Sequence, residues 1–386
     1  MLSLALICIG IILYTYFGYF FLVVLLSKFI KREVKKGDYT PKVALVIAAY
    51  NEEKSIIKKI ENSLALNYPA DLLNIYVVSD ASSDHTDELV ESYNNPRVKL
   101  IRIEGRVGKT EARNRALKRI SEKIIVFSDA TTDYDKDSIS QLVKNFSDPN
   151  VSMVSGQLRY KIPQGSKIGI GQKLFWAYES MIKEAQTNIG TLTGSLGCMT
   201  AFRRVDYIDL PANIIEDFTE PLMMIQNGKR IVYEPNAICF ESTTEKSKQE
   251  WQMRIRVIRG GMTGLLYAKS VLNPFKHFAA SFQLISHKVL RWFVPVFAII
   301  AFVTSTLSLI QTQSLSSAII FILQVIFYLI VAMAYWAERK NIKIPLIGIV
   351  QYLFIVNLAS LVAIFKVMTT KLEATWETDR NSEQAI

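Results

Sequence analysis

Long apolar runs near both ends of the chain constrain its fold more than any other feature of the sequence. Residues 2–27 carry no charged side chain, and further apolar runs cover residues 289–310, 318–336 and 345–367. About 20 consecutive apolar residues are enough for a helix to cross a bilayer. The sequence therefore predicts one N-terminal and three C-terminal transmembrane helices, with a long water-exposed region between them.

The composition and the flanking charges agree with this prediction. Hydrophobic residues make up 50% of the chain, and the mean hydropathy is +0.20. A cleaved signal peptide is the alternative for residues 2–27, but that run has no basic n-region and no small-residue cleavage site, and it is too long. Lysines and arginines follow it directly over residues 28–36, so the positive-inside rule places the central region in the cytoplasm.

The net charge of +10 suits an anionic membrane surface or anionic substrates. The basic residues are scattered rather than gathered in one patch, which argues against nucleic acid as a partner. The three cysteines, Cys8, Cys198 and Cys239, lack metal-ligand spacing, and Cys8 lies in an apolar run. Neither a zinc site nor a disulfide framework is therefore expected.

From Pro41 the pattern changes to alternating strands and helices. Short β-branched runs predict the strands, and amphipathic runs between them predict the helices. The expected strands cover residues 42–48, 74–79, 98–103, 124–127, 151–160 and 230–235, and the expected helices cover 50–66, 86–93, 110–120, 172–186 and 214–227. Repeated strand–helix units predict an α/β fold with a mostly parallel sheet, whose ligands bind at the carboxyl ends of the strands.

Acidic residues occupy the positions where such a sheet binds its ligands. Asp80 and Asp129 each follow a predicted strand directly, and the pair Glu216-Asp217 begins a predicted helix. Each of these groups alone fits ordinary helix capping or a turn. Together they indicate carboxylates that converge on one cleft, where one contacts a nucleotide, one holds a divalent cation against a diphosphate, and one accepts a proton.

The segment from Gly105 to Thr110 resembles a phosphate-binding P-loop only superficially. The P-loop spacing would require a glycine where Ile103 stands, so a Walker A site is not expected. Lys109 at the start of a helix is still placed to meet a phosphate, and the alternative is a solvated loop lysine.

A basic helix is expected over residues 249–260, with Arg254, Arg256 and Arg259 on it. These arginines fit either a helix face on anionic lipid or charge stabilisation of a leaving diphosphate. The mixed aromatic and basic segment 261–288 is expected to form helices in the membrane interface.

Five motifs in this order carry a resemblance to a known family. They are Ala48–Glu53, Val78–Thr86, Gly108–Asn114, Phe127–Ala130 and Glu216–Phe218. The set resembles family-2 glycosyltransferases, and in particular the membrane-bound bacterial branch that includes hyaluronan, chitin-oligosaccharide and poly-N-acetylglucosamine synthases.

This resemblance implies a Rossmann-like GT-A domain that uses a nucleotide-diphospho-sugar, with uridine as the family's usual nucleoside. It implies inverting transfer, with Asp217 as the catalytic base and Asp129 as the ligand of Mg²⁺ or Mn²⁺. The implied donor-binding residues are Tyr50, Glu52, Asp80, Lys109, Asp129, Arg256 and Arg259, and the acceptor would enter beside Gly194, Gly197 and Glu216.

The chain departs from the family pattern in two places. The D-x-D motif reads Asp129-Ala130-Thr131, so Thr131 through a water molecule or Asp133 would have to replace the second carboxylate. The Q-x-x-R-W motif of the processive members keeps only its arginine, as Arg256. The second departure favours transfer of one or a few sugars over synthesis of a long polymer.

Three other functions are weighed against this one. A processive polysaccharide synthase with a secretion channel uses the same chemistry, and an inactive membrane scaffold with a vestigial fold would explain the incomplete D-x-D motif. A transporter is disfavoured because the C-terminal apolar runs contain almost no charge to mark a pathway.

The expected organisation is that of a multi-pass protein of the bacterial plasma membrane with a cytoplasmic catalytic domain. Its partners would be the nucleotide-sugar donor, a saccharide or lipid-linked acceptor and membrane lipids, in the synthesis of surface polysaccharide or glycolipid. The expected segments are a transmembrane helix at 1–27, a basic linker at 28–40, the GT-A domain at 41–245, basic and interfacial helices at 246–288, three transmembrane helices at 289–369 and a polar tail at 370–386.

Overall fold

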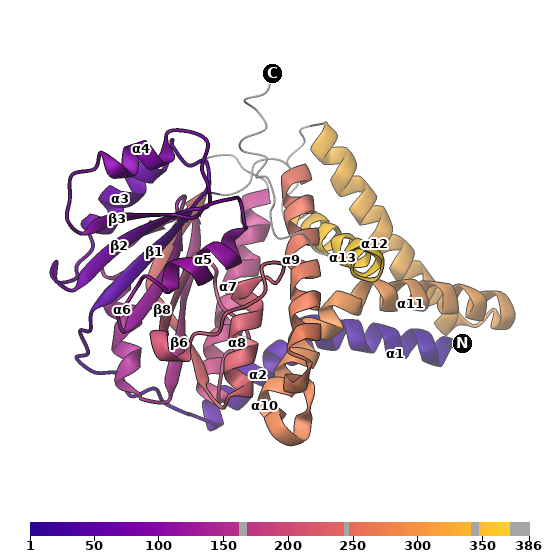
Figure 1. Cartoon of the computed structure of the whole chain (residues 1–386). Helices are drawn as coiled ribbons and strands as arrows, with labels where there is room; N and C mark the ends of the chain where they lie inside the picture. The colour runs from indigo at the N-terminus through magenta and orange to yellow at the C-terminus, as the bar shows by residue number, and fades with distance from the viewer. Residues whose placement is uncertain (162–167, 243–246, 341–346, 371–386) are drawn as a thin grey trace.

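The computed structural model describes residues 1–161, 168–242, 247–340 and 347–370. Figure 1 shows a sheet covered by helices on one side of the molecule and a group of long helices on the other. The predicted polar tail lies outside the described residues, apart from Thr370.

The sheet has eight strands among the described residues. Their order across the sheet is β3 (Val98–Arg102), β2 (Leu73–Ser79), β1 (Val43–Ala49), β4 (Ile124–Asp129), β7 (Met199–Arg203), β6 (Val151–Lys161), β8 (Arg230–Ser242) and β5 (Asp133–Tyr134). The first four strands in this order run parallel to one another, as predicted. Strands β1, β2 and β4 are buried over nearly their whole length, which explains why their sequences are almost continuously apolar, whereas the edge strand β3 is mostly not buried.

The second half of the sheet is mixed. Strand β7 runs antiparallel to both β4 and β6, β8 is parallel to β6, and β5 is antiparallel to β8. The sheet is thus mostly but not entirely parallel. A run of alternating or apolar residues does not encode strand direction, so the sequence could not reveal this reversal.

Helices cover the sheet, and their bounds differ modestly from the predicted ones. They are α3 (Ile56–Leu64), α4 (Thr86–Glu91), α5 (Lys109–Leu117), α6 (Ser138–Lys144), α7 (Ile168–Ile189) and α8 (Glu216–Gln226), with short 3₁₀ turns at Asn145–Ser147 and Arg204–Asp206. The helix expected from residue 50 begins only at Ile56, because the chain first makes a turn in which Asn51 has a left-handed φ of 54°.

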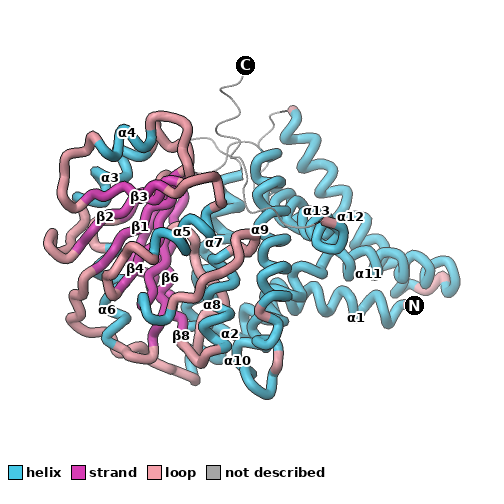
Figure 2. Tube along the Cα trace, in the orientation of Figure 1, coloured by secondary structure: helices cyan, strands magenta, loops and turns pink. Residues whose placement is uncertain are grey.

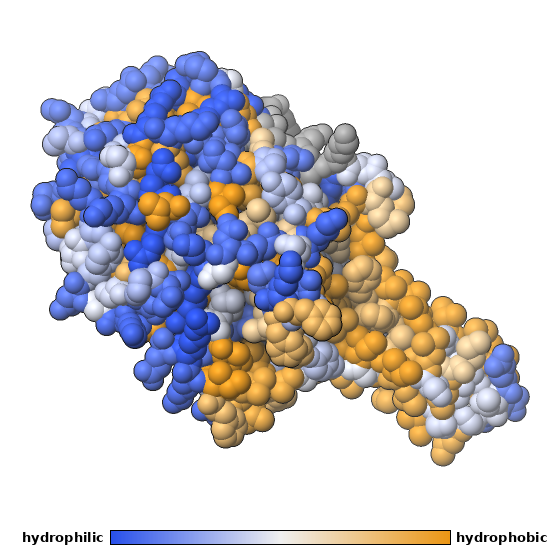
Figure 3. All heavy atoms as spheres, turned by 60° about the horizontal axis from the view of Figure 1, so that its bottom comes forward, coloured by the Kyte–Doolittle hydropathy of each residue, from blue (hydrophilic) through white to orange (hydrophobic). Residues whose placement is uncertain are grey.

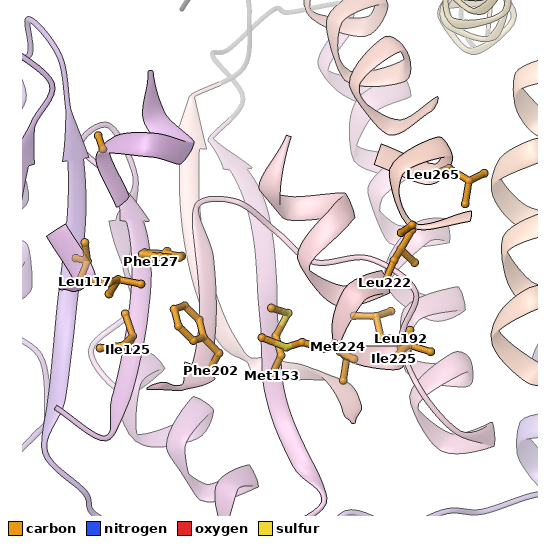
Figure 4. Close-up of a cluster of buried hydrophobic side chains, with 14 of the residues drawn as sticks. Leu117, Ile125, Phe127, Met153, Leu192, Phe202, Leu222, Met224, Ile225 and Leu265 are labelled. Carbon is orange, nitrogen blue, oxygen red and sulfur yellow. The ribbon is translucent and has the colours of Figure 1, made fainter. Parts of the chain in front are cut away.

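One hydrophobic core continues from the sheet into the helices beside it. Figure 4 shows Phe127 of β4 and Phe202 of β7 in the same layer as Leu222 of α8. The Phe127 and Phe202 ring centroids are 4.9 Å apart. Leu265 extends this core to α9 (Ser247–Tyr267), which stands between the sheet domain and the long helices in Figure 2.

Four helical segments of the described chain are long and apolar enough to cross a membrane: Leu2–Phe29, Pro274–Thr312, Leu315–Ala337 and Val350–Thr369. This finding agrees with the predicted arrangement of one N-terminal and three C-terminal apolar helices. Figure 3 shows their hydrophobic surface as an arm that projects from the largely hydrophilic sheet domain. The elements are α1 (Leu2–Leu13), a π-helical turn η1 (Tyr14–Gly18), α2 (Tyr19–Phe29), α11 (Leu290–Thr312), α12 (Leu315–Arg339) and α13 (Ile347–Thr369).

The basic helix is longer than expected. Helix α9 continues to Tyr267, and only then do a 3₁₀ turn (Lys269–Leu272), α10 (Pro274–Leu284) and the π-helical turn η5 (Ile285–Val289) lead into α11. Helix α13 packs along α9, and Arg259 Nη2 donates to the carbonyl oxygen of Thr370 at 2.8 Å. Helix α9 therefore contacts both α8 of the sheet domain and the apolar helix α13.

Candidate functional site

The structure places Asp80 and Asp129 at the same edge of the sheet. Strand β1 separates them: Ala49 pairs with Ser79, and Ala48 pairs with Asp129. Both carboxylates thus follow the carboxyl ends of parallel strands, where open α/β sheets bind their ligands.

The Asp80 carboxylate holds the loop that leads into α5. Its Oδ1 accepts a hydrogen bond from the Val107 amide and its Oδ2 accepts one from the Gly108 amide, both at 2.9 Å. Gly108 has a φ of 90°, which side-chain-bearing residues rarely adopt, and it caps α5. The predicted contact of Asp80 with the nucleobase stays a prediction, and the structure adds that this side chain fixes the loop before Lys109.

Lys109 and Arg113 lie one turn apart on α5 and bind two carboxylates between them. Lys109 Nζ lies 2.6 Å from Asp129 Oδ1 and 3.7 Å from Glu216 Oε1. Arg113 Nη1 lies 2.7 Å from Glu216 Oε1, and Arg113 Nη2 lies 3.6 Å from Asp129 Oδ1. These four side chains are called the charge cluster below. It joins the end of β4 to the start of α8.

Arg113 was not predicted as a site residue, although it lies in one of the five motifs. Its side chain is 1% exposed, and its guanidinium lies 4.1 Å from the centre of the Phe127 ring. It also donates from Nη2 to the carbonyl oxygen of Gly197 at 3.1 Å. The spacing of four residues from Lys109 is the signal that could have identified it, because such residues share one helix face.

Glu216 and Asp217 are neighbours in sequence but titrate differently. Burial opposes ionisation of Glu216, but Arg113 and Lys109 outweigh it and hold the Glu216 pKa at about 2. Burial raises the pKa of Asp217 to about 6, and the Glu216 carboxylate adds to this shift. Two carboxyl groups with separated pKa values can take different chemical roles, and the group near 6 suits proton transfer.

The glycine loop lies directly against Asp217. Ser195 donates to the Asp217 carbonyl oxygen from its amide at 2.8 Å and from its hydroxyl at 2.7 Å. A Cβ at Gly197 would lie 3.2 Å from Asp217 Oδ2, and one at Gly194 would lie 3.8 Å from Phe218 Cδ2. The absence of side chains on this loop therefore leaves room beside the Asp217 carboxylate.

The Glu216 side chain differs from its predicted acceptor-side position. Its Oε2 accepts from the Thr110 hydroxyl at 3.0 Å and its Oε1 binds Arg113, so the carboxylate faces α5 rather than the glycine loop. Arg113 links Glu216 to that loop, because its Nη1 binds Glu216 and its Nη2 donates to the Gly197 carbonyl oxygen.

Tyr50 and Glu52 lie in the turn after β1, beside the turn after β2. The Arg106 guanidinium lies 3.9 Å from the centre of the Tyr50 ring. The Glu52 amide donates to the Thr86 hydroxyl at 2.8 Å, and the Glu52 carboxylate accepts from the Ser55 hydroxyl. This end of the edge thus presents an aromatic ring and polar groups next to Asp80, as a nucleoside pocket requires.

Arg256 and Arg259, which the resemblance assigns to the donor, have different surroundings in the structure. Arg256 of α9 is partly buried; burial lowers the pKa of its guanidinium, and nearby carboxylates oppose that shift. These carboxylates are Glu216, Asp217 and Asp129. Arg259 instead donates to the backbone and hydroxyl oxygens of Thr370, both at 2.8 Å, so the structure brings Arg256 but not Arg259 to the charge cluster.

Lys59 holds the turn that follows Asp129. This role of Lys59 was not predicted from the sequence. Its side chain is buried, and its Nζ donates to the Thr132 carbonyl oxygen at 2.5 Å and lies 4.0 Å from the centre of the Tyr134 ring. Burial lowers its pKa to about 8. No motif signals this role, because the lysine lies in an ordinary amphipathic helix.

Asp129 offers one carboxylate to a divalent cation. Its Oδ1 is buried and accepts no hydrogen bond from the described residues, although Lys109 Nζ lies near it. The alternative second ligand, Asp133, is held at Oδ2 by Lys58 at 3.0 Å and Lys161 at 2.7 Å. The described residues contain no group of three or more potential metal ligands. The unpartnered Asp129 Oδ1 fits a divalent cation that takes one carboxylate and completes its coordination with substrate phosphates.

Comparison with protein families gives a match over the sheet domain. Residues 44–210 match the model of glycosyl transferase family 2. Poly-β-1,6-N-acetyl-D-glucosamine synthases of Staphylococcus aureus (strain COL) and Staphylococcus epidermidis are 30% and 28% identical over 232 residues. The alignments cover 58% of this chain and 55% of each synthase, so the chain spans about half the length of these curated relatives.

Among solved structures, a mannosyltransferase from Pyrobaculum calidifontis in complex with GDP-Man and Mn²⁺ is similar over 93% of this chain and 99% of its own. The TM-score is 0.68 and the sequence identity is 22%. This likeness confirms the predicted GT-A fold.

Proposed function

We propose, from the match of residues 44–210 to glycosyl transferase family 2, that the chain transfers a sugar from a nucleotide-diphospho-sugar to an acceptor hydroxyl at a membrane surface. One observation carries the proposal beyond the family match. The charge cluster lies at the ligand-binding edge of the sheet, and the adjacent Asp217 has a pKa raised to about 6.

The donor would lie along the edge from β2 to α8. Its nucleoside would meet Tyr50, Glu52 and Asp80, and its diphosphate would meet Lys109 at the N-terminus of α5. Cationic side chains and helix N-termini favour phosphate groups. Arg256 would add positive charge on the α9 side, where the leaving nucleoside diphosphate gains charge.

Asp129 would hold Mg²⁺ or Mn²⁺ together with the donor phosphates. The bound ion would supply Lewis-acid stabilisation of the leaving diphosphate. Lys109 Nζ lies 2.6 Å from Asp129 Oδ1, so this ammonium would move toward the phosphates as the donor and the ion enter.

Asp217 would act as the general base in a single inverting displacement. The acceptor oxygen forms a bond to the anomeric carbon while the bond from that carbon to the diphosphate oxygen breaks. The acceptor proton passes to the Asp217 carboxylate, and the electron pair leaves with the nucleoside diphosphate. The glycine loop at residues 194–197 leaves space for the acceptor beside Asp217.

The number of sugars added separates two versions of this function. The incomplete Q-x-x-R-W motif favours one or a few additions, whereas the curated relatives are named as synthases of a polymer. Product length on a gel distinguishes the two versions. An inactive scaffold is disfavoured, because the carboxylates, their cationic partners and the glycine loop are all in place.

The four apolar helices and the basic flank at residues 28–36 support a place in the plasma membrane with the sheet domain in the cytoplasm. The test is to incubate the full chain in detergent with a panel of nucleotide sugars and to measure released nucleoside diphosphate, with and without Mn²⁺. The panel includes N-acetylglucosamine and mannose donors, the sugars named for the relatives. Release from none of the donors, with any metal and a range of saccharide and lipid acceptors, would refute the proposal.

A further inference from the structure

The ion pair between Lys109 and Asp129 uses the carboxylate oxygen that the proposed divalent cation would need. Lys109 Nζ lies 2.6 Å from Asp129 Oδ1. That oxygen is buried but accepts no hydrogen bond from the described residues, so the contact is an ion pair without the alignment of a hydrogen bond. Because a misaligned contact is weaker than an aligned one, the lysine can be exchanged for another cation.

The two cations of the charge cluster differ in their freedom to move. The Arg113 side chain is 1% exposed, donates to Glu216 Oε1 at 2.7 Å and packs against the Phe127 ring. The side chains of Lys109 and Asp129 are 32% and 31% exposed, so their ion pair lies on the open side of the cluster. Lysine also has a flexible stem. Lys109 is therefore the cation of the cluster that can leave its carboxylate.

The surroundings of Lys109 allow its side chain to move while its backbone stays in place. Asp80 accepts two hydrogen bonds of 2.9 Å from amides of the preceding loop and so fixes that loop. Glu216 Oε1 lies 3.7 Å from Lys109 Nζ and remains as a carboxylate partner when the contact with Asp129 breaks. The ammonium can thus turn toward a phosphate at the N-terminus of α5, where anionic groups are favoured.

The charges of the cluster favour the entry of a cation and an anion together. The carboxylates of Asp129 and Glu216 face the cations of Lys109 and Arg113, so the four charges balance without a ligand. A divalent cation alone would meet the ammonium and guanidinium groups at close range, and a diphosphate alone would meet the Asp129 carboxylate. Like charges at such distances repel strongly where water is partly excluded. Joint entry of both ligands avoids either excess of charge.

We propose that Lys109 is an internal counter-cation that leaves Asp129 only when the divalent cation and the donor diphosphate bind together, so that each ligand strengthens the binding of the other. In the ligand-free site the ammonium neutralises Asp129. In the loaded site it binds the diphosphate instead, and Asp129 is free to bind the cation. This inference rests on the proposed function and adds how that same site is regulated.

Loss of the Lys109 ammonium should therefore have opposite effects on two ligands. Mn²⁺ no longer competes with the ammonium for Asp129, so Mn²⁺ alone binds more tightly. The diphosphate loses a cationic partner, so nucleoside diphosphate binds more weakly in the presence of Mn²⁺. A lysine that only contacted the donor, or only supported the fold, would not tighten the binding of Mn²⁺.

The test measures two affinities of the full chain in neutral detergent. Binding of Mn²⁺ alone is followed by the EPR signal of the free ion, and binding of UDP and of GDP is followed by calorimetry in excess Mn²⁺. Lys109→Met should bind Mn²⁺ alone about tenfold or more tightly than the wild type, and should bind the preferred nucleotide about tenfold or more weakly, as expected for a charged contact.

Further variants control this measurement. Lys109→Gln is polar but uncharged and should behave as Lys109→Met does, so it carries the test if the methionine variant is unstable. Lys109→Arg should resemble the wild type. Lys118→Met removes an exposed lysine directly after α5 and should match the wild type in both affinities. Addition of Asp129→Asn to Lys109→Met should abolish the gain in Mn²⁺ affinity.

Two results would overturn the inference. One is that neither neutral variant of Lys109 binds Mn²⁺ alone more tightly than the wild type. The other is a gain in affinity that persists after Asp129→Asn, because the ion would then bind elsewhere.

The same samples separate this inference from the proposed function. If the wild type releases nucleoside diphosphate from a donor but the Lys109 variants show no gain in Mn²⁺ affinity, only the inference about Lys109 fails. If the gain is found but neither UDP nor GDP binds and no donor is cleaved, the proposed function fails, and only the exchange of Lys109 for a cation remains.

Discussion

At the scale of single residues, the cations of α5 give two adjacent carboxyl groups different properties. Arg113 and Lys109 hold the Glu216 pKa at about 2, whereas burial leaves the Asp217 pKa at about 6. Glu216 is therefore a permanent anion that positions α5, and Asp217 is the group able to exchange a proton near neutral pH. The proposed role of Asp217 as general base follows from this difference between the two pKa values.

The first prediction concerns the pH dependence of transfer. A general base must be ionised, so kcat/KM should fall about tenfold per pH unit below a pH of about 6, the Asp217 pKa. Because the Glu216 charge contributes to that raised pKa, Glu216→Gln should move the acidic limb of the profile to lower pH. Glu61→Gln, at an exposed position of α3, is the control. An acidic limb that stays in place in Glu216→Gln would contradict the assigned coupling.

The second prediction concerns the metal. Among the described residues, Asp129 is the carboxylate that we propose as the metal ligand. Because one carboxylate binds Mn²⁺ weakly without donor phosphates, saturable Mn²⁺ binding should require nucleoside diphosphate. EDTA should stop turnover. Titration of Mn²⁺ with and without nucleoside diphosphate measures this. Asp133→Asn should leave Mn²⁺ binding unchanged, since Lys58 and Lys161 already hold that side chain. Loss of binding in Asp133→Asn would show that a second carboxylate takes part.

Sequence reasoning located the acidic residues of the site better than their supports. The position of Asp80, Asp129 and Lys109 at one edge of the sheet could be predicted, because strand ends and helix starts are visible as breaks in the hydrophobic pattern. Lys59 and Arg113 could not, because their roles depend on which helix packs against which strand end. Arg259 was assigned to the donor because of its place on the basic helix, but helix rotation directs it toward Thr370.

At the scale of elements, close contact between α8 and α9 brings the basic helix to the catalytic carboxylate. A Cβ at Gly260 would lie 1.9 Å from Ile215 Cδ1, and one at Gly264 would lie 2.1 Å from the Thr219 hydroxyl oxygen. Ile215 and Thr219 flank Asp217 in sequence. The two glycines thus allow α9 to approach the first turn of α8, which brings Arg256 near Asp217.

The third prediction tests this approach with Gly260→Ala. Alanine favours a helix over glycine by about 1 kcal/mol, but overpacking costs about 1–3 kcal/mol. We therefore expect a lower melting temperature and a lower kcat, with nucleoside diphosphate affinity less affected. Gly190→Ala is the matched control, because a Cβ there meets nothing within 4 Å. A Gly260→Ala protein that is more stable and fully active would contradict the packing.

Some strands and helix ends could be predicted from the sequence pattern, and others could not. The four parallel strands were predicted within about a residue or two, and for β1, β2 and β4 the reason is that buried parallel strands form continuous apolar runs. The reversed strand β7 and the two-residue strand β5 depend on long-range pairing with β4, β6 and β8. Helix α9 continues past residue 260, its predicted end, and Gly260 and Gly261 lie inside it as positions of close contact with Ile215 and Trp292.

At the scale of the whole molecule, the N-terminal helix is part of the catalytic domain's support. Tyr19 is buried, its ring centre lies 5.4 Å from that of His287, and its hydroxyl accepts from Gln186 Nε2 at 2.8 Å. Tyr14 shares a hydrogen bond of 2.9 Å with Ser286. The sequence indicated a membrane helix here, but not that it packs on α7 of the sheet domain.

The fourth prediction is that removal of residues 1–29 destabilises the sheet domain as well as its membrane attachment. The truncation uncovers the face of α7 that carries Gln186 and leaves the partners of Tyr19 without their contacts. Thermal melting in detergent should lose its cooperative transition relative to the full chain. Retention of both the transition and donor cleavage would show that the N-terminal helix only tethers the protein.

The central claim is that Asp129 and Asp217 share one site but have separate roles, and one measurement tests it most directly. Nucleoside diphosphate affinity in Mn²⁺ and donor turnover are measured side by side in Asp129→Asn, Asp217→Asn and the exposed control Asp71→Asn. We predict that Asp129→Asn loses affinity, that Asp217→Asn keeps it while turnover falls by about 10²–10⁴-fold, and that Asp71→Asn matches the wild type. Near-normal turnover in Asp217→Asn, or unchanged affinity and turnover in Asp129→Asn, would contradict the account.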